Sequence, residues 1–183
     1  MEHNKALLNL ILDRRSCKEY LPDPLDRPTL AAIVEAGRYA PSAMNRQRCH
    51  FYVVTDSKIL DAITRTVSKN LPGFEEKDCR YGAPALVVVT NRKNNPVALQ
   101  DASCAMENMM LAACALGVAS RWINQPYALS DNPELRALLA PAGLSDGERI
   151  CASLALGLPA GPLYPARPER TGNPVSWLTG EDA

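Results

Sequence analysis

Ala85-Leu86-Val87-Val88-Val89-Thr90 is the stretch that decides the fold of this chain. The run is short, almost wholly apolar and rich in β-branched residues, which is typical of a strand buried on both faces. Further strands are predicted over residues 51–55, 118–123 and 150–156. A strand buried on both faces needs helices on each side of its sheet, so the pattern predicts a mixed layer fold with the sheet covered on both faces.

Helical patterns lie between these strands. Helices are predicted over residues 3–13, from Asp26 or from Pro28-Thr29 to between Gly37 and Pro41, and over 58–69, 101–116 and 133–139. Expected N-caps are Asp56-Ser57, Asp101 and Ser130-Asp131. The alanine-rich segment 101–116 lets another backbone approach closely, which makes it a candidate central or dimer-interface helix.

Two segments are expected to have neither a regular helix nor a strand. Residues 71–81 contain a proline, a glycine and dense charge, and predict a loop or short helical excursion where a substrate lid can lie. Five of the fifteen prolines crowd the tail after Gly157, so residues from about 158 to 183 are expected to form an extended arm. We therefore expect one domain, residues 1–183, that ends in this arm.

The composition excludes several classes of protein. Of 183 residues, 46% are hydrophobic and 22% charged, with a formal net charge of zero, as in an ordinary globular domain. Without a basic run, a signal-peptide pattern or a long apolar stretch, we expect a cytoplasmic protein that binds neither nucleic acid nor membrane. The six cysteines and two histidines lack metal-ligand spacing, so no metal is expected.

Three polar stretches look suited to one phosphorylated planar ligand. Arg14-Arg15-Ser16-Cys17-Lys18 and the tail residues Arg167 and Arg170 offer cationic donors for a phosphate, and residues 41–47 offer a hydroxyl, two amides and a turn. Two of them have a simpler interpretation. The first is an ordinary solvated helix end, where cations complement the helix dipole, and the middle stretch is a turn before a strand.

Together, in this order and spacing, the three stretches resemble the nitroreductase family of FMN-dependent oxidoreductases. In that family an Arg-Arg-Ser-x-Arg-x-Tyr stretch binds the FMN phosphate and ribityl chain, and it stands here as Arg14-Arg15-Ser16-Cys17-Lys18-Glu19-Tyr20. The resemblance implies that Arg14, Arg15, Ser16 and Lys18 contact the cofactor. Lys18 replaces the commoner arginine, which keeps the charge and loses the planar fork.

The middle stretch resembles the family's Pro-Ser-x-x-Asn-x-Gln-Pro-Trp, which packs against the flavin of the partner subunit. The implied pocket residues are Pro41, Ser42, Ala43, Asn45 and Gln47. Arg48-Cys49 stands where Pro-Trp usually follows, a change that we expect to affect substrate preference more than FMN binding.

Four more positions fit the family's pattern. Ala83-Pro84 precedes the buried strand, and Asn108 supplies a mid-helix amide. The resemblance implies that Asn124-Gln125 presents a backbone amide near flavin N5, and that Gly157 lies in the family's Gly-Tyr-Pro turn, with Leu158 replacing the tyrosine. Arg167 or Arg170 would clamp the phosphate.

The resemblance implies an α+β, three-layer, nitroreductase-like fold with a mainly antiparallel central sheet, and a homodimer that exchanges its C-terminal arms. It also implies reduction of a small-molecule acceptor, a nitroaromatic or quinone, by NADH or NADPH through FMN. No protein side chain is expected to act as the catalyst, because the chemistry takes place at flavin N5. Two alternatives stay open: a flavin-binding carrier or sensor without turnover, and a specialised member that fragments flavin or removes halogen.

Overall fold

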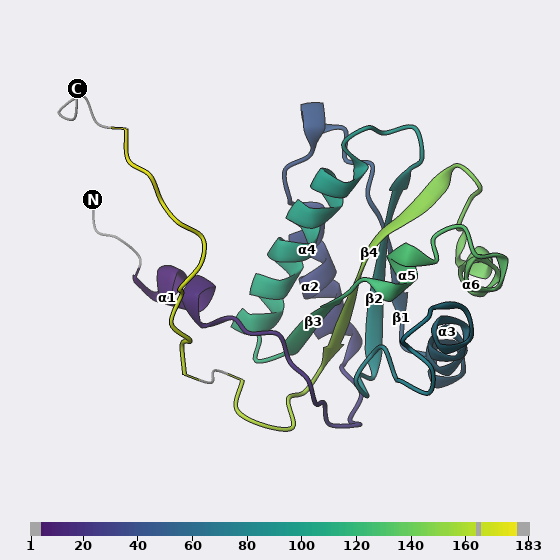
Figure 1. Ribbon diagram of the computed structural model, residues 1–183, viewed down its shortest axis with the longest axis horizontal. Helices are drawn as coiled ribbons and strands as arrows, with labels where there is room; N and C mark the ends of the chain where they lie inside the picture. Colours follow the sequence, from purple (N-terminus) through teal and green to yellow (C-terminus); the bar gives the residue numbers. More distant parts are fainter. Residues whose placement is uncertain (1–4, 164–165, 179–183) are drawn as a thin grey trace.

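The computed structural model describes residues 5–163 and 166–178 (Figure 1). Its sheet contains four strands, namely β1 (His50–Val54), β2 (Ala85–Arg92), β3 (Ala119–Ile123) and β4 (Glu148–Gly157). They lie in the order β1-β2-β4-β3, and each neighbouring pair is antiparallel. The four predicted strands and the antiparallel sheet are therefore confirmed.

The apolar run at residues 85–90 forms the middle of the sheet, as its composition predicts. All residues of β2 except Arg92 are buried, and Val87 pairs with Leu154 of β4. Successive side chains point to opposite faces, so Leu86 and Val88 belong to one core cluster while Val87 belongs to the other.

Helices cover both faces of the sheet. They are α1 (Lys5–Asp13), α2 (Arg27–Arg38), α3 (Ser57–Asn70), α4 (Ala98–Ala115), α5 (Gln125–Ala128) and α6 (Pro133–Leu139), with short 3₁₀ turns η1 (Ala43–Asn45) and η2 (Ala140–Ala142). Figure 1 shows α2 and α4 on one face and α3, α5 and α6 on the other, which confirms a three-layer fold. Within the described residues, no helix is long and apolar enough to cross a membrane.

Two of the predicted N-caps are wrong. Helix α4 begins at Ala98, so Asp101 lies inside its first turn and is not the N-cap. Helix α6 is capped by Asn132, whose side chain accepts from the Leu135 amide, rather than by Ser130-Asp131. Ser130 has a tertiary partner instead, because its Oγ accepts from the Ile150 amide at 2.9 Å. The cap Asp56 of α3 is confirmed, and of the two predicted starts of α2 the structure selects Asp26, which is its N-cap.

Helix α4 packs on both the sheet and α2, which agrees with the close backbone approach that its alanine content predicts. It packs closely on α2 at Gly37, where an added Cβ would lie 2.8 Å from Cγ of Met109. Beside this contact, Asn108 Nδ2 donates to the carbonyl oxygen of Ala36 at 3.0 Å. The mid-helix amide therefore joins the two helices of the layer.

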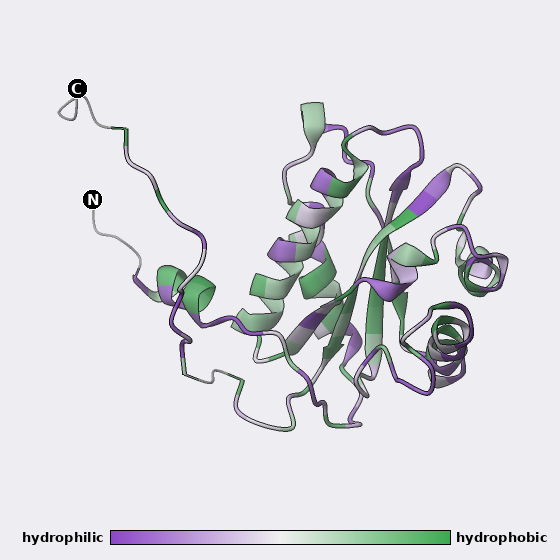
Figure 2. Ribbon diagram, viewed as in Figure 1, coloured by the Kyte–Doolittle hydropathy of each residue, from purple (hydrophilic) through white to green (hydrophobic). Residues whose placement is uncertain are grey.

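Helix α1 and the described part of the tail leave the body of the molecule together (Figure 1). No residue of α1 is buried, and four of its apolar side chains are 51–59% exposed, namely Leu7, Leu8, Ile11 and Leu12. Figure 2 shows this helix as an apolar segment outside the sheet layers. Residues 166–178 contain no helix or strand, and Val175, Trp177 and Leu178 are exposed.

The loop between α3 and β2 is tied to the body at one end. Within residues 71–81 the chain forms turns only, which agrees with the predicted loop. Arg80 donates to Asp61 at 3.0 Å and to Thr64 at 2.9 Å, and Asp78 accepts from the Gly82 amide at 2.8 Å. These contacts hold the end of the loop near β2, and a lid role for the loop stays a prediction.

Candidate functional site

The stretch that follows α1 runs beside the outer strand of the sheet and lines a cavity of about 390 Å³. Ser16 forms a parallel bridge with Ser120, and the Cys17 amide donates to the Ser120 carbonyl at 3.0 Å. Arg15, Ser16 and Lys18 line one side of this amino-terminal cavity, and residues 159 and 161–163 line another. A hydroxyl and two cationic groups therefore gather where the resemblance implies a phosphate.

The two arginines of this stretch have different partners. Arg15 Nη1 donates to the carbonyl oxygens of Leu12 at 2.7 Å and Arg14 at 2.9 Å, so this side chain closes the C-terminal end of α1. Its buried Nε has no hydrogen-bond partner within the described residues. Arg14 Nε lies 3.8 Å from Glu107 Oε1 of α4, a loose ion pair. Arg15 thus bonds to the end of the helix through Nη1, while its Nε–H is a buried donor that a ligand could engage.

One of the two tail arginines returns to the same helix. Arg167 Nε donates to Asp13 Oδ1 at 2.6 Å, and its Nη2 donates to Asn9 Oδ1 at 3.0 Å. The hydrogen bond from Arg167 holds the pKa of Asp13 below its usual value. Arg170 is exposed. The structure therefore brings Arg167, and not Arg170, beside the end of α1.

The turn at residues 41–47 forms the second group of predicted site residues. Its backbone is left-handed at Met44, Asn45 and Gln47, with φ of 54°, 51° and 51°. Two bonds close the turn: the Gln47 amide donates to Ser42 Oγ at 3.0 Å, and Gln47 Nε2 donates to Asn45 Oδ1 at 2.9 Å. Non-glycine residues held in this conformation cluster at functional sites, where the surrounding structure offsets the strain.

Asp101 anchors this turn to helix α4. Its side chain is buried, and Oδ1 accepts from the Ala43 amide at 2.9 Å while Oδ2 accepts from Asn95 Nδ2 at 3.0 Å. The same Asn95 nitrogen donates to Asn91 Oδ1 of β2 at 3.1 Å. Interpreting Asp101 as a helix cap missed this role, because its partner Ala43 lies 58 residues away in the sequence.

The turn opens on a second cavity of about 680 Å³, the turn cavity. Four of the predicted pocket residues line it, namely Pro41, Ser42, Asn45 and Gln47. Ala43 contributes its amide to Asp101 instead.

The two cavities lie at opposite ends of α4. The turn is bonded to Asp101 in the first turn of this helix, while Ser16 pairs with Ser120 just beyond its last turn. At 1.5 Å per residue, the helix separates these points by about 20 Å. Within one chain, the structure does not bring residues 14–18 and 41–47 into one pocket.

Three remaining predicted residues have structural roles at or near strand ends. Asn124 Oδ1 accepts from Trp122 Nε1 at 2.6 Å. Gln125 begins α5, and its buried Oε1 has no hydrogen-bond partner among the described residues. Gly157 ends β4, where an added Cβ would lie 2.7 Å from Cδ of Pro84. Close packing alone therefore requires a glycine at position 157.

Arg121 of β3 lies near the amino-terminal cavity, and no motif in the sequence marks it as a site residue. Its guanidinium carbon lies 4.1 Å from the centre of the Tyr81 ring, and Nη2 donates to the Tyr81 hydroxyl at 3.2 Å. Nη1 donates to the Cys17 carbonyl at 3.4 Å. Arg121 thus joins the loop before β2 to the cavity-lining stretch, across 40 residues of sequence.

Comparison with known proteins gives one consistent result. A family model described as the nitroreductase family matches residues 11–158. A relative from Archaeoglobus fulgidus, provisionally named NADH dehydrogenase/NAD(P)H nitroreductase, is 29% identical over 158 residues, which cover 83% of this chain and 84% of the relative.

Solved structures with the same fold cover almost all of the chain. A nitroreductase from Bacteroides fragilis with bound FMN is 34% identical, with a TM-score of 0.86 over 94% of this chain and 98% of that one. An oxidized iodotyrosine deiodinase bound to FMN and 3-iodo-L-tyrosine is 21% identical, with a TM-score of 0.76 over 94% of this chain and 99% of that one. The latter likeness concerns the fold alone.

Proposed function

The chain belongs to the nitroreductase family, and on that premise we propose that it is an FMN-dependent oxidoreductase. It takes electrons from NADH or NADPH and reduces an electron-poor small molecule such as a nitroaromatic or a quinone. The observation that carries the proposal is the amino-terminal cavity, where Arg15, Ser16 and Lys18 line one wall and the buried Nε of Arg15 has no hydrogen-bond partner in the part of the chain that the structure describes.

The donors of this cavity suit the phosphate and ribityl chain of FMN. Lys18 supplies a point charge, Ser16 a hydroxyl, and Arg15 an unsatisfied N–H, which together match a dianion with several acceptor oxygens. Arg14 and Arg167 lie beside the same helix end, where each is paired with a carboxylate, Glu107 and Asp13 respectively. When bound, FMN supplies the hydride chemistry, and the chain holds and orients it.

The other half of the site comes from a second copy of the chain. The turn with Ser42, Asn45 and Gln47 lies about 20 Å from the amino-terminal cavity of its own chain. This separation supports the inference, implied by the family resemblance, that the turn contacts the flavin of the partner in a homodimer. The exposed apolar side chains of α1 and of the tail support such a pairing, because patches of this kind mark protein interfaces. The exchanged tails would bring Val175, Trp177 and Leu178 onto the partner.

Purification and steady-state kinetics test this function. We expect a yellow protein with about one FMN per chain that oxidises NADH or NADPH when menadione is added. A colourless protein that takes up no flavin after reconstitution and desalting would falsify the proposal. A yellow protein that neither nicotinamide reduces would instead be a flavin carrier or sensor.

A further inference from the structure

A third cavity, of about 620 Å³, lies next to the turn cavity and is rich in arginine. Arg46 lies in the turn at residues 41–47, Arg48 directly follows it, and Arg92 ends strand β2. Ser145 and Gly147, just before β4, and Glu148, its first residue, close the other side. Gln47 and Arg48 line both this arginine cavity and the turn cavity, so the two are neighbours.

The three guanidinium groups lack acidic partners. In residues 5–163 and 166–178, no carboxylate forms an ion pair with Arg46, Arg48 or Arg92. Like charges gathered around one cavity repel each other, and an anion between them removes this cost. Guanidinium forks also match phosphate oxygens in a bidentate geometry.

One acidic side chain also lines the arginine cavity, but its oxygens are already engaged. The carboxylate of Glu148 accepts from the Tyr52 hydroxyl at 3.1 Å, from Thr90 Oγ1 at 3.0 Å and from the Ser145 amide at 3.1 Å. The cavity lining therefore contains one carboxylate, which is bonded to these other donors, and three guanidinium groups. The balance of charge in the cavity remains positive.

The neighbouring cavities suggest what kind of anion binds. A ligand that lies across both would place a planar ring at the flavin-facing turn and a phosphate among the arginines, which describes a nicotinamide dinucleotide. A phosphate monoester carries close to two negative charges at neutral pH, whereas each phosphate of the pyrophosphate diester carries one. Three arginines without ion pairs in the described residues therefore match the charge of the 2′-phosphate better than that of the pyrophosphate.

We propose that Arg46, Arg48 and Arg92 bind the 2′-phosphate of NADPH and make NADPH the preferred electron donor. This inference rests on the proposed function, because it takes the turn at residues 41–47 to face a flavin.

Binding of 2′,5′-ADP to the FMN-loaded protein, measured by titration calorimetry, tests the site without turnover. The parent should bind 2′,5′-ADP at least about tenfold more tightly than 5′-AMP or inorganic phosphate. Arg48→Ala and Arg92→Ala should each weaken 2′,5′-ADP by about tenfold or more, the usual effect of losing one charge-assisted bond. The ratio of kcat/KM for NADPH to that for NADH should fall to a similar extent.

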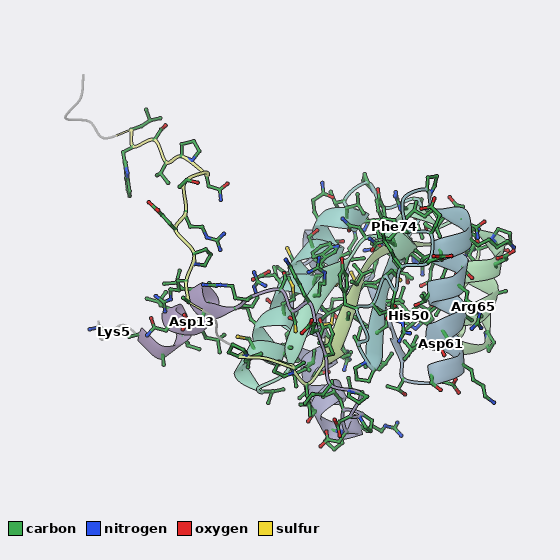
Figure 3. The ribbon with its side chains drawn as sticks, turned by 60° about the horizontal axis from the view of Figure 1, so that its bottom comes forward. Lys5, Asp13, His50, Asp61, Arg65 and Phe74 are labelled. Carbon is green, nitrogen blue, oxygen red and sulfur yellow. The ribbon has the colours of Figure 1, made fainter. Side chains whose placement is uncertain are left out.

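Arg65→Ala is the matched control, since Arg65 is an exposed arginine on α3 that does not line the cavity (Figure 3). It should bind 2′,5′-ADP as the parent does, and the melting temperatures of all variants should show that they are folded.

Equal affinity of the parent for 2′,5′-ADP and 5′-AMP, or parental binding in both arginine variants, would overturn the proposal. Inorganic phosphate that binds as tightly as 2′,5′-ADP would also overturn it. So would arginine variants that lose binding of 4-nitrobenzoate but keep parental binding of 2′,5′-ADP, because the cavity would then be a site for acidic acceptors. Selective, arginine-dependent binding of 2′,5′-ADP without NADPH oxidation would contradict the proposed function but support the 2′-phosphate site. NADPH oxidation without selective binding of 2′,5′-ADP would support the proposed function but contradict this site.

Discussion

Single residues of the proposed site differ in how many of their donors are already used. Ser16 and Lys18 line the amino-terminal cavity, whereas Arg15 closes the end of α1 with its Nη1. The tail contributes two arginines to the sequence pattern, and only Arg167 contacts α1 in the structure, through Asp13 and Asn9. The structure therefore favours Arg167 over Arg170 as the tail arginine that contributes to FMN binding.

Arg167→Ala should weaken FMN binding by about tenfold or more, because Arg167 holds the tail on helix α1 through Asp13, directly before the stretch that lines the proposed phosphate site. Arg170→Ala, the same change three residues along the tail, should alter FMN affinity less than about threefold. Quenching of flavin fluorescence measures both. Loss of affinity in Arg170→Ala alone would assign the phosphate contact to the other arginine.

Glu148 is a residue whose ionisation stabilises the fold. Burial by itself raises its pKa, but hydrogen bonds from the Ser145 amide, Thr90 and Tyr52 outweigh burial and lower the pKa below its usual value. A carboxyl with a lowered folded-state pKa stabilises the protein above its unfolded pKa, and this stability is lost as the pH falls through the folded value.

Glu148→Gln should therefore reduce the free energy of unfolding at pH 7 by about 1.5–3 kcal/mol, the range for hydrogen bonds to a charged group. The difference from the parent should shrink below about pH 4, where the parent side chain becomes protonated as well. Urea titrations across this pH range measure it. A difference that stays constant down to pH 3 would show that the charge of Glu148 contributes nothing.

Among the helices and strands, α1 is the element whose stability is not accounted for by packing within its own chain. A helix of nine residues is marginal in water without tertiary packing. Its apolar side chains nevertheless remain exposed, and Figure 3 shows Lys5 and Asp13 on a helix set apart from the layers. We therefore expect its apolar face to pack on a partner subunit.

Leu8→Glu tests this expectation. Leu8 is 55% exposed within the chain, so the charge should leave the monomer folded but disrupt the dimer and, with it, retention of FMN. Val53→Glu is the matched control, because Val53 is 44% exposed on β1, at the sheet edge opposite β3. Light scattering and the flavin content per chain are the measurements. A fully dimeric, FMN-loaded Leu8→Glu protein would contradict the assignment.

At the scale of the whole molecule, the length of α4 is the observation that supports the proposed two-chain site. The amino-terminal cavity and the turn lie about 20 Å apart along this helix, so two chains placed together can complete two sites. Interfaces of obligate dimers bury on the order of 2,000 Å² or more. Folding, dimerisation and FMN binding should therefore be linked.

This linkage predicts a concentration-dependent melting temperature. Dilution of the protein should lower it, and excess FMN should raise it, since a ligand at about a hundred times its Kd adds roughly 2.7 kcal/mol to the stability of the form that binds it. Differential scanning fluorimetry at several protein and FMN concentrations gives both dependences. An FMN-loaded monomer in light scattering at micromolar concentration would rule out the two-chain site.

The sequence by itself determined the elements whose signals are local. The buried run at residues 85–90, the helix start at Asp26 and the cap Asp56 depend on neighbours in the chain, and the structure agrees with all three. Asp101 and Ser130 were misassigned as caps because distant amides, those of Ala43 and Ile150, use their side chains instead. Similarly, only the tertiary structure gathered Arg46, Arg48 and Arg92 around one cavity. Which polar groups meet depends on sheet order and helix packing, which bring together segments that no local pattern connects.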